Sequence, residues 1–356
     1  MNALIAAVGQ RWRASRRERA AAISSGLLLL AFLNLECGSD GSAPSPAGAG
    51  FAAGGDSASG GLPASGNAGA GGAIAMWTTN GSKYSLSLGS TYLELDSANG
   101  ARITALRVGG STGPNLLADS LATGQVDNWG STFWPSPQNW PWPPTDEGSI
   151  NAINTLPYTA AGDAQTLTLT SQLNTAAPTV SVIKKFSADL AKQAIVIDYT
   201  MTNGGTTTPV TVAPWEITRV AAGGITFYAD AGDPSAVIPP TTLTDGVRWY
   251  QHNASAADQP AKFLSDGKGW IAHAAGDLLL IKSFPDIAPS QSPTGEAEIE
   301  IYSDPKYVEV ENQGAVQTLA PGEALHWTVR WYARKLPAPA VVGSADLVAY
   351  VQNQIK

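Results

Sequence analysis

Two glutamates in the segment Lys306–Gly314 (KYVEVENQG) are spaced for proton transfer. Alternation along a strand places Tyr307, Glu309 and Glu311 on one face and two valines on the other. Carboxylates two residues apart on a strand are separated by roughly 6.5–7 Å at the backbone, a distance that suits an acid and a base. The same spacing is common on exposed strands, so taken alone it favours a surface pair.

A second polar segment, Val212–Phe227 (VAPWEITRVAAGGITF), carries a tryptophan and two opposite charges near the end of a predicted strand. Trp215, Glu216 and Arg219 precede a Gly-Gly turn. A few placed polar groups beside an aromatic ring are typical of pockets for polar ligands. Glu216 and Arg219 could equally form an ion pair at the surface, and both interpretations stay open.

The densest aromatic segment is Trp129–Pro144 (WGSTFWPSPQNWPWPP), with four tryptophans and five prolines. Prolines at this spacing remove the N–H groups that regular sheet pairing needs, so we predict a rigid loop. Large rings on a stiff loop either pack into the protein's own core or stack on a ligand such as a sugar. We expect the loop to contact a ligand, with Trp134 and Trp142 among the stacking rings.

Composition excludes several classes of function. The 356 residues include 21 basic and 29 acidic ones, a formal net charge of −8, and without residues 1–36 the balance is 16 against 27, or −11. Nucleic-acid binding requires a basic surface, so we expect no nucleic-acid partner. Motifs of serine hydrolases, zinc proteases and nucleotide enzymes are absent, and we assign no cofactor and no metal. The histidines, His252, His273 and His326, stand at neither triad-like nor metal-ligand spacing.

The N-terminus resembles an export signal followed by a lipoprotein cysteine. Five arginines in residues 10–19 precede an apolar run over residues 20–35, about the length of a signal-peptide core. The only cysteine, Cys37, follows at once. Asn34 and Glu36 occupy positions where a bacterial lipoprotein signal usually has a leucine-like and a small residue. We predict lipidation at Cys37, with cleavage by an ordinary signal peptidase nearby as the alternative.

These features divide the chain into three parts. Residues 1–36 are the predicted export signal. Residues 37–76 hold the cysteine and a run of Gly, Ala, Ser and Pro, which cannot bury enough apolar surface to fold and is predicted to be a flexible tether. Residues 77–356 form the predicted folded domain. We expect an exported protein of the bacterial cell envelope, in the periplasm or on the outer membrane, that touches a membrane only through its lipid.

Alternating apolar and polar residues recur through the predicted domain and indicate an all-β fold. Clear examples are 92–96 (YLELD), 194–201 (AIVIDYTM) and 324–332 (ALHWTVRWY). The only convincing helix is 344–354. A domain of about 280 residues exceeds one immunoglobulin-like sandwich and favours a large antiparallel double sheet. In the last strand, the residues expected to face the core are Leu325, Trp327, Val329 and Trp331.

Short motifs in a fixed order resemble the galactose mutarotase-like superfamily, which includes the aldose 1-epimerases. Residues 92–110 (YLELDSANGARITALRVGG), with PNLL following, are similar to its opening strands, and 307–332 (YVEVENQGAVQTLAPGEALHWTVRWY) to its closing strands. A bacterial branch of the superfamily is indicated by 133–138 (FWPSPQ), 213–218 (APWEIT) and 281–282 (IK). The similarity extends over about 250 residues.

This resemblance implies a β-supersandwich with a sugar-sized cleft. In the epimerases, a glutamate base and a histidine acid open and reclose the sugar ring, and Glu311 matches that base by position. Where the epimerases carry the histidine, this sequence has ITR at 217–219, and arginine cannot serve as a general acid near neutral pH. An acid would have to be another group, such as Tyr302, Tyr307 or a late histidine.

We therefore expect a carbohydrate-binding protein, with Glu311 as the candidate catalytic base if it is an enzyme. The ligand would be a saccharide or a sugar acid opposite Arg219 and Lys282, and the protein a monomer. A sugar epimerase or related carbohydrate-active enzyme is one alternative, and a non-catalytic envelope or adhesion module with a protein partner is another. The predicted carbohydrate contacts are Trp134, Gln138, Trp142, Trp215, Glu216, Arg219 and Lys282.

Overall fold

The computed structural model describes residues 75–232, 241–255 and 260–356. The predicted export signal, Cys37 and all but the last two residues of the predicted tether lie outside the described residues. Within the described ranges, no helix combines the length and apolar character needed to cross a membrane.

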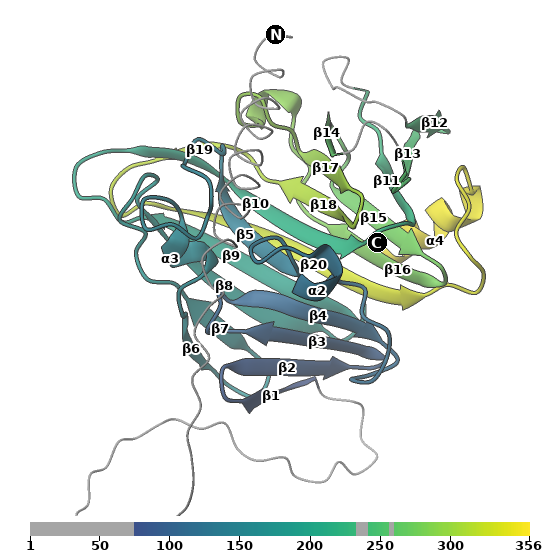
Figure 1. Cartoon of the computed structure of the whole chain (residues 1–356), viewed down its shortest axis with the longest axis horizontal. Helices are drawn as coiled ribbons and strands as arrows, with labels where there is room; N and C mark the ends of the chain where they lie inside the picture. Colours follow the sequence, from purple (N-terminus) through teal and green to yellow (C-terminus); the bar gives the residue numbers. More distant parts are fainter. Residues whose placement is uncertain (1–74, 233–240, 256–259) are drawn as a thin grey trace, which may run out of the picture. The chain divides into compact units, whose positions relative to one another are not determined.

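The described chain is nearly all β, in two antiparallel sheets of ten strands each, as the alternation predicted (Figure 1). Strand β19 (Gln317–Leu319) pairs with the outer part of one long strand of the first sheet, here called sheet A. The other strands of sheet A, in spatial order, are β1 (Met76–Asn80), β2 (Lys83–Leu88), β3 (Thr91–Asp96), β4 (Arg102–Val108), β5 (Ser131–Ser136), β10 (Val210–Ala221), β18 (Tyr307–Gln313), β17 (Ile299–Asp304) and β14 (Ala261–Ser265).

The second sheet, sheet B, is also a continuous antiparallel ladder. In spatial order, its strands are β12 (Thr242–Thr244), β13 (Val247–Gln251), β11 (Ile225–Ala229), β15 (Trp270–Ala275), β16 (Leu278–Ser283), β20 (Ala324–Lys335), β9 (Ala194–Asn203), β8 (Val180–Asp189), β7 (Leu167–Thr170) and β6 (Thr159–Gly162).

The main core lies between the two sheets, because the alternating strands of each turn their apolar residues toward the other. Phe133 of β5 stacks on Tyr199 of β9 with ring centroids 4.1 Å apart, which joins sheet A directly to sheet B. The four residues expected on the inner face of β20 are all buried, which confirms that prediction: Leu325, Trp327, Val329 and Trp331.

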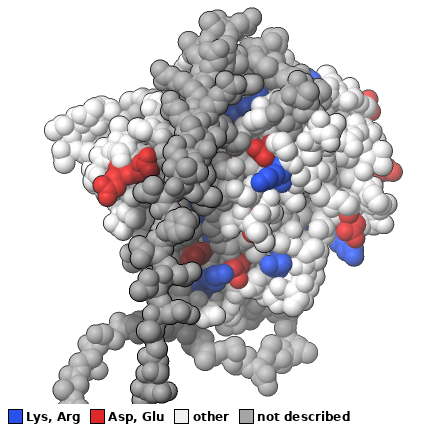
Figure 2. Space-filling model, viewed as in Figure 1, with Lys and Arg blue, Asp and Glu red and all other residues white. Residues whose placement is uncertain are grey.

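On the face drawn in Figure 2, most of the described surface is uncharged, with Lys, Arg, Asp and Glu side chains scattered over it.

Helices are short and few among the described residues. The C-terminal helix α4 (Ala345–Ile355) confirms the predicted one, and its N-cap Ser344 accepts a hydrogen bond from the backbone N–H of Leu347. Leu347 and Val351 pack into a second apolar cluster with strands of sheet B. The remaining helical segments are α2 (Ser120–Thr123), α3 (Asn151–Asn154) and the 3-10 turn η1 (Pro289–Gln291).

The prediction of a loop throughout Trp129–Pro144 is wrong for its first part, because residues 131–136 form β5 in the interior of sheet A. Pro135 lies directly opposite Pro214 of β10 in the register. An antiparallel ladder alternates hydrogen-bonded and non-hydrogen-bonded residue pairs. Two prolines can face each other in a non-hydrogen-bonded pair, because neither residue of such a pair donates a backbone N–H to the other strand. The pairing of β5 with β10 therefore continues past Pro135 and Pro214.

Candidate functional site

Strand β10 lies in the middle of sheet A and sends charged side chains to both of its sides. Glu216 and Thr218 project toward sheet B, since Glu216 contacts Tyr199 of β9 and Trp331 of β20. Trp215 and Arg219 belong to the opposite side, where they contact Glu311 and Glu309 of β18. Neighbours in the sequence are thus separated by the sheet itself, as the period of two requires.

Between the sheets, Glu216 and Lys282 form a fully buried ion pair with a separation of 2.8 Å. The remaining contacts of Glu216 come from the Tyr199 hydroxyl at 2.5 Å and the Trp331 indole N–H at 2.9 Å. Lys282 Nζ also donates to Thr218 Oγ1 at 3.0 Å. Burial lowers the pKa of Lys282, and Glu216 opposes that shift. The hydrogen bonds and the ion pair of Glu216 and Lys282 are all made with buried residues, so both side chains lie in the core.

The other side of sheet A carries a cluster that we call the carboxylate face, centred on Glu300, Glu309, Glu311, Arg219 and Lys262. Register sets it: Glu311 lies opposite Glu300 of β17, and Glu309 lies opposite Arg219 of β10. All three carboxylates are buried. The sequence-based preference for an exposed pair at Glu309 and Glu311 is therefore wrong, because the side chains of Trp215, Arg219 and Lys262 pack against them on the same side of the sheet.

Glu311 is held through only one of its two oxygens. Oε2 accepts from the Trp215 indole N–H at 2.8 Å and from Lys262 Nζ at 3.2 Å. Oε1 is buried and has no hydrogen-bond partner among the described residues. Lys262 also contacts Glu300 at 2.6 Å and lies 4.6 Å from the centroid of the Trp215 ring. Glu311 is thus fixed in orientation while one acceptor stays unused.

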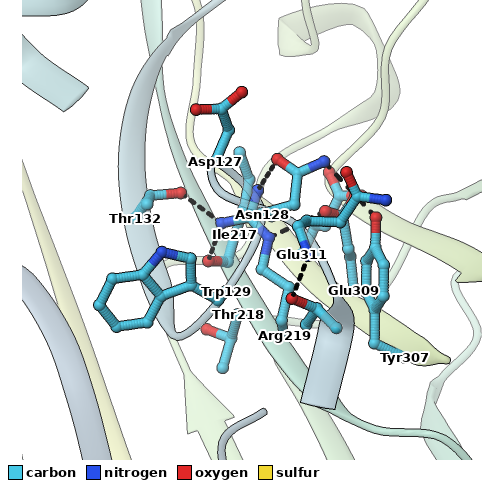
Figure 3. Close-up of polar contacts among 12 residues, drawn as sticks. Asp127, Asn128, Trp129, Thr132, Ile217, Thr218, Arg219, Tyr307, Glu309 and Glu311 are labelled. Atoms are coloured by element: carbon cyan, nitrogen blue, oxygen red, sulfur yellow. Dashed lines mark hydrogen bonds and ion pairs between the residues drawn. The ribbon is translucent and has the colours of Figure 1, made fainter. Parts of the chain in front are cut away.

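Arg219 is fixed by three elements of the same face (Figure 3). Its Nε donates to Glu309 at 2.9 Å, and its Nη1 donates to Thr132 of β5 at 2.6 Å. Its Nη2 donates to Asn128, in the loop before β5, at 3.4 Å. The guanidinium carbon lies 5.1 Å from the centroid of the Trp134 ring. These contacts use the forked donors of arginine for positioning, in place of the proton transfer that a histidine could perform.

Burial changes the ionisation of this face. Burial raises the pKa of Glu309 to about 7, against the opposing charge of Arg219, and raises the pKa of Glu300 well above its ordinary value, against Lys262. Burial alone would lower the pKa of Lys262, but Glu300 and Glu311 outweigh it and raise that pKa. With a pKa of about 7, the carboxyl group of Glu309 can both donate and accept a proton near neutral pH, which suits a general acid or base.

The tryptophan-rich segment packs around Trp134 rather than standing apart from the sheet. Trp134 is 3% exposed, and its edge-to-face neighbours are Trp140, Trp142 and Trp215, with centroids 5.4–6.1 Å away. Its indole N–H donates to Asn154 of α3 at 2.8 Å. Trp142 is half-buried. Of the two rings predicted to stack on a ligand, Trp134 and Trp142, it is therefore the more exposed one.

Gln138, also predicted as a contact, is half-buried, and its backbone N–H donates to Glu296 Oε1 at 2.7 Å. Glu296 Oε2 accepts from Gln313 Nε2 at 2.8 Å. Gln313 lies two residues beyond Glu311 on β18. The loop that carries Gln138 is therefore tied to the end of the carboxylate face through Glu296.

Lys262, Glu296 and Glu300 were missed from the sequence. A signal for Glu300 was present, because EIEIYSDPKYVEVENQ reads as two alternating strands around an Asp-Pro-Lys turn. Pairing them as a hairpin places Glu300 opposite Glu311. Lys262 gave no comparable signal, since β14 joins β17 only through sheet pairing between segments far apart in the chain.

The histidines do not supply the acid that the sequence lacks at Arg219. His273 lies on β15 and His326 on β20, both in sheet B. His252 follows β13, accepts from the backbone N–H of Gly223 and contacts the carbonyl of Asp304. Tyr302, opposite Glu309 in the register, and Tyr307 on the same strand as Glu309 lie closer to the carboxylate face. Among the described residues, no group of three His, Cys, Asp or Glu side chains has an arrangement that could hold a metal ion.

The chain is similar to several solved structures of sugar-related proteins. One described as a candidate aldose 1-epimerase, from Escherichia coli K12, aligns with 71% of this chain and 99% of its own at 14% identity and a TM-score of 0.43. A galactose mutarotase-like protein from Clostridium acetobutylicum aligns with 71% of this chain and 95% of its own at 10% identity and a TM-score of 0.41. No protein-family model and no curated protein matches the sequence.

A third similar structure is the galactosidase domain of an alpha-galactosidase–sucrose kinase, aligned with 74% of this chain and 42% of its own at 9% identity and a TM-score of 0.42. The structural neighbours thus include aldose 1-epimerase and mutarotase-like proteins, as the sequence resemblance predicted.

The inner ion pair predicts a specific loss of stability. Replacing Lys282 with Met should lower the free energy of unfolding by about 3–5 kcal/mol, because Glu216 would be left buried without its cation. The double change Glu216→Gln with Lys282→Met should recover part of that loss. Urea unfolding measures both. The control is Lys335→Met in an exposed pair with Asp277, expected to cost less than about 1 kcal/mol; an equal loss in both single variants would contradict the core role.

The raised pKa of Glu309 predicts a pH dependence of stability. From about pH 4.5 to 7 the folded protein retains a proton that the unfolded chain releases, so the stability contributed by Glu309 falls as pH rises through that window. The slope is about 1.4 kcal/mol per pH unit at most. Urea unfolding of the wild type and of Glu309→Gln from pH 4.5 to 8 isolates it, and a pH-independent difference between the two would refute the shift.

Proposed function

We propose that the protein is a carbohydrate-binding protein whose carboxylate face receives a saccharide. The observation that carries the proposal is the state of Glu311, whose Oε2 is fixed by Trp215 and Lys262 while its buried Oε1 has no partner among the described residues. Leaving a buried acceptor unused costs free energy. A ligand that donates a hydrogen bond would remove that cost.

Sugar hydroxyls suit this geometry because each can donate to a carboxylate, and charge-assisted hydrogen bonds are about twice as strong as neutral ones. Half-buried Trp142 adds aromatic surface near the same strands, and the buried Trp215 orients Glu311 through its indole N–H. Lys262, with a side chain 34% exposed, is the member of the face that reaches the surface. It marks the side from which a ligand would enter.

The same contacts argue for a sugar without a carboxylate. Arg219 and Lys282 were the residues expected opposite a sugar acid, but each is already paired with a glutamate, Glu309 and Glu216 respectively. A sugar carboxylate would compete with those glutamates for the same cations. A sugar acid is thus the less favourable of the two predicted ligand classes.

A second candidate function is a sugar epimerase, favoured by the pKa of about 7 at Glu309. Glu311 would take the proton of the anomeric hydroxyl while protonated Glu309 gave one to the ring oxygen, so that the ring C–O bond breaks as the carbonyl forms. Reclosure on the other carbonyl face returns both protons. General acid and base catalysis contributes roughly 10²–10⁴-fold, so both carboxyl groups would be needed.

The proposal includes export and attachment to the bacterial cell envelope by a lipid on Cys37, with the domain acting as a monomer at the end of its tether. Support comes from the order of arginines, apolar run, cysteine and Gly/Ala-rich segment in residues 10–75. A tether of this composition would hold the domain clear of the membrane while leaving it anchored.

Glu311→Gln should weaken saccharide binding about tenfold, because the neutral amide accepts a weaker hydrogen bond than the carboxylate. The measurement is NMR of the full chain with a panel of aldoses and uronic acids, which reports line broadening on binding and anomer exchange on turnover. Exposed Glu147→Gln is the matched control. If no sugar responds to the wild type, the sugar proposal fails and a protein-binding envelope module gains support.

Cys37→Ala should move the protein from the membrane fraction to the soluble fraction of the cell envelope, because a single Cys in the sequence offers a single thiol for the lipid. Fractionation of expressing bacteria, followed by detection of the protein in each fraction, measures this. An unchanged distribution between wild type and variant would exclude lipid attachment at Cys37.

A further inference from the structure

The carboxylate face contains more acids than bases. Glu296 belongs to its electrostatic surroundings, because its charge raises the pKa of both Lys262 and Glu300. With it the face has four carboxyl groups, Glu296, Glu300, Glu309 and Glu311, against two cations, Arg219 and Lys262. Glu311 also acts on Lys282, but Lys282 is paired with Glu216. Arg219 acts on Arg102, whose charge Asp127 opposes. Each of these neighbouring pairs has one charge of each sign, so the excess on the face is unchanged.

Neither cation of the face is available for the unused oxygen of Glu311. Lys262 Nζ is shared between Glu300 at 2.6 Å and Glu311 Oε2 at 3.2 Å. Arg219 directs its Nε to Glu309 and its two terminal nitrogens to Thr132 and Asn128. Glu311 Oε1, on a fully buried residue, is therefore an acceptor without a cation.

A buried carboxylate that lacks a cation either keeps a proton or acquires a cation from outside. Glu300 and Glu309 follow the first alternative, since burial raises the pKa of both and so favours their protonated forms. A ligand that brings its own positive charge would allow the second. Replacing a shared proton by an ammonium group would satisfy several carboxylates at once, because an ammonium has three donors.

We propose that the natural ligand is a hexosamine with a free ammonium group, held by the unpartnered Oε1 of Glu311 and the neighbouring carboxylates. This inference rests on the proposed function and narrows its class of sugar. N-acetylation would remove the charge that the face lacks, and a uronic acid would add a fifth carboxylate. Both changes should be selected against at this site.

The test is titration calorimetry of the full chain with glucosamine, galactosamine and mannosamine. The reference ligands are the N-acetyl derivative of each, the parent hexose, glucuronic acid and methylamine. We expect at least one hexosamine to bind about tenfold more tightly than its N-acetyl derivative and its parent hexose, which is the size of one charge-assisted hydrogen bond. Methylamine, which has the charge without the sugar, should bind far more weakly.

Variants connect the preference to the site. In Glu311→Gln the ratio of hexosamine affinity to N-acetylhexosamine affinity should fall from about ten to near one, while Glu147→Gln should keep the wild-type ratio. Glu309→Gln, which also removes one carboxylate, provides a second variant with the same expected direction. Thermal melting of each variant establishes that it is folded before its ratio is measured.

The outcomes separate this inference from the proposed function. Neutral hexoses that bind as tightly as hexosamines, with binding lost in Glu311→Gln, would overturn the preference for an amine and leave the saccharide site standing. No response to any sugar would overturn both. Methylamine binding as tightly as a hexosamine would define a simple amine site and overturn the sugar part. A hexosamine preference retained in both site variants would place the amine elsewhere and also overturn it.

Discussion

The need to neutralise charge out of contact with water organises the centre of this protein. Strand β10 carries Glu216 toward sheet B and Arg219 toward the opposite side of sheet A, three residues apart in the sequence. Each finds a partner of opposite charge on another strand, Lys282 for Glu216 and Glu309 for Arg219. A buried ion without such a partner would cost several kcal/mol. The pairing of β10 with β18 in sheet A, and the packing of β10 against β16 of sheet B, thus bring opposite charges together as well as apolar residues.

The two ion pairs differ in completeness. On the inner side, Glu216 receives hydrogen bonds from Tyr199 and Trp331 in addition to Lys282, and its needs are met within the protein. The outer side leaves Glu311 Oε1 without a partner among the described residues and gathers more carboxylates than cations. Structural ion pairs are ordinarily satisfied, so this incomplete arrangement is the feature on which the proposed ligand site rests.

Aromatic residues contact two charged groups of the carboxylate face, Glu311 and Arg219. Trp215 orients Glu311 through its indole N–H, and Trp134 fills the space between Trp140, Trp142 and the guanidinium of Arg219. A tryptophan that positions a charged group is as useful to binding as one that stacks on the ligand, because a fixed acceptor loses little entropy when the ligand arrives. The same rings also help to secure β5, so the loop and the site are stabilised together.

The fold class could be predicted from the residues alone, since period-two alternation in segments such as 194–201 and 324–332 is typical of strands with one buried face. The residues alone also indicated that Glu309 and Glu311 share a face, because that follows from the same period. The burial of this face and the approach of Lys262 to it could not be predicted, because strand order in a sheet depends on pairing between distant segments. The same period of two puts Trp215 and Arg219 on one side of β10 and Glu216 on the other, but packing alone fixes which side meets sheet B and brings Lys282 to Glu216.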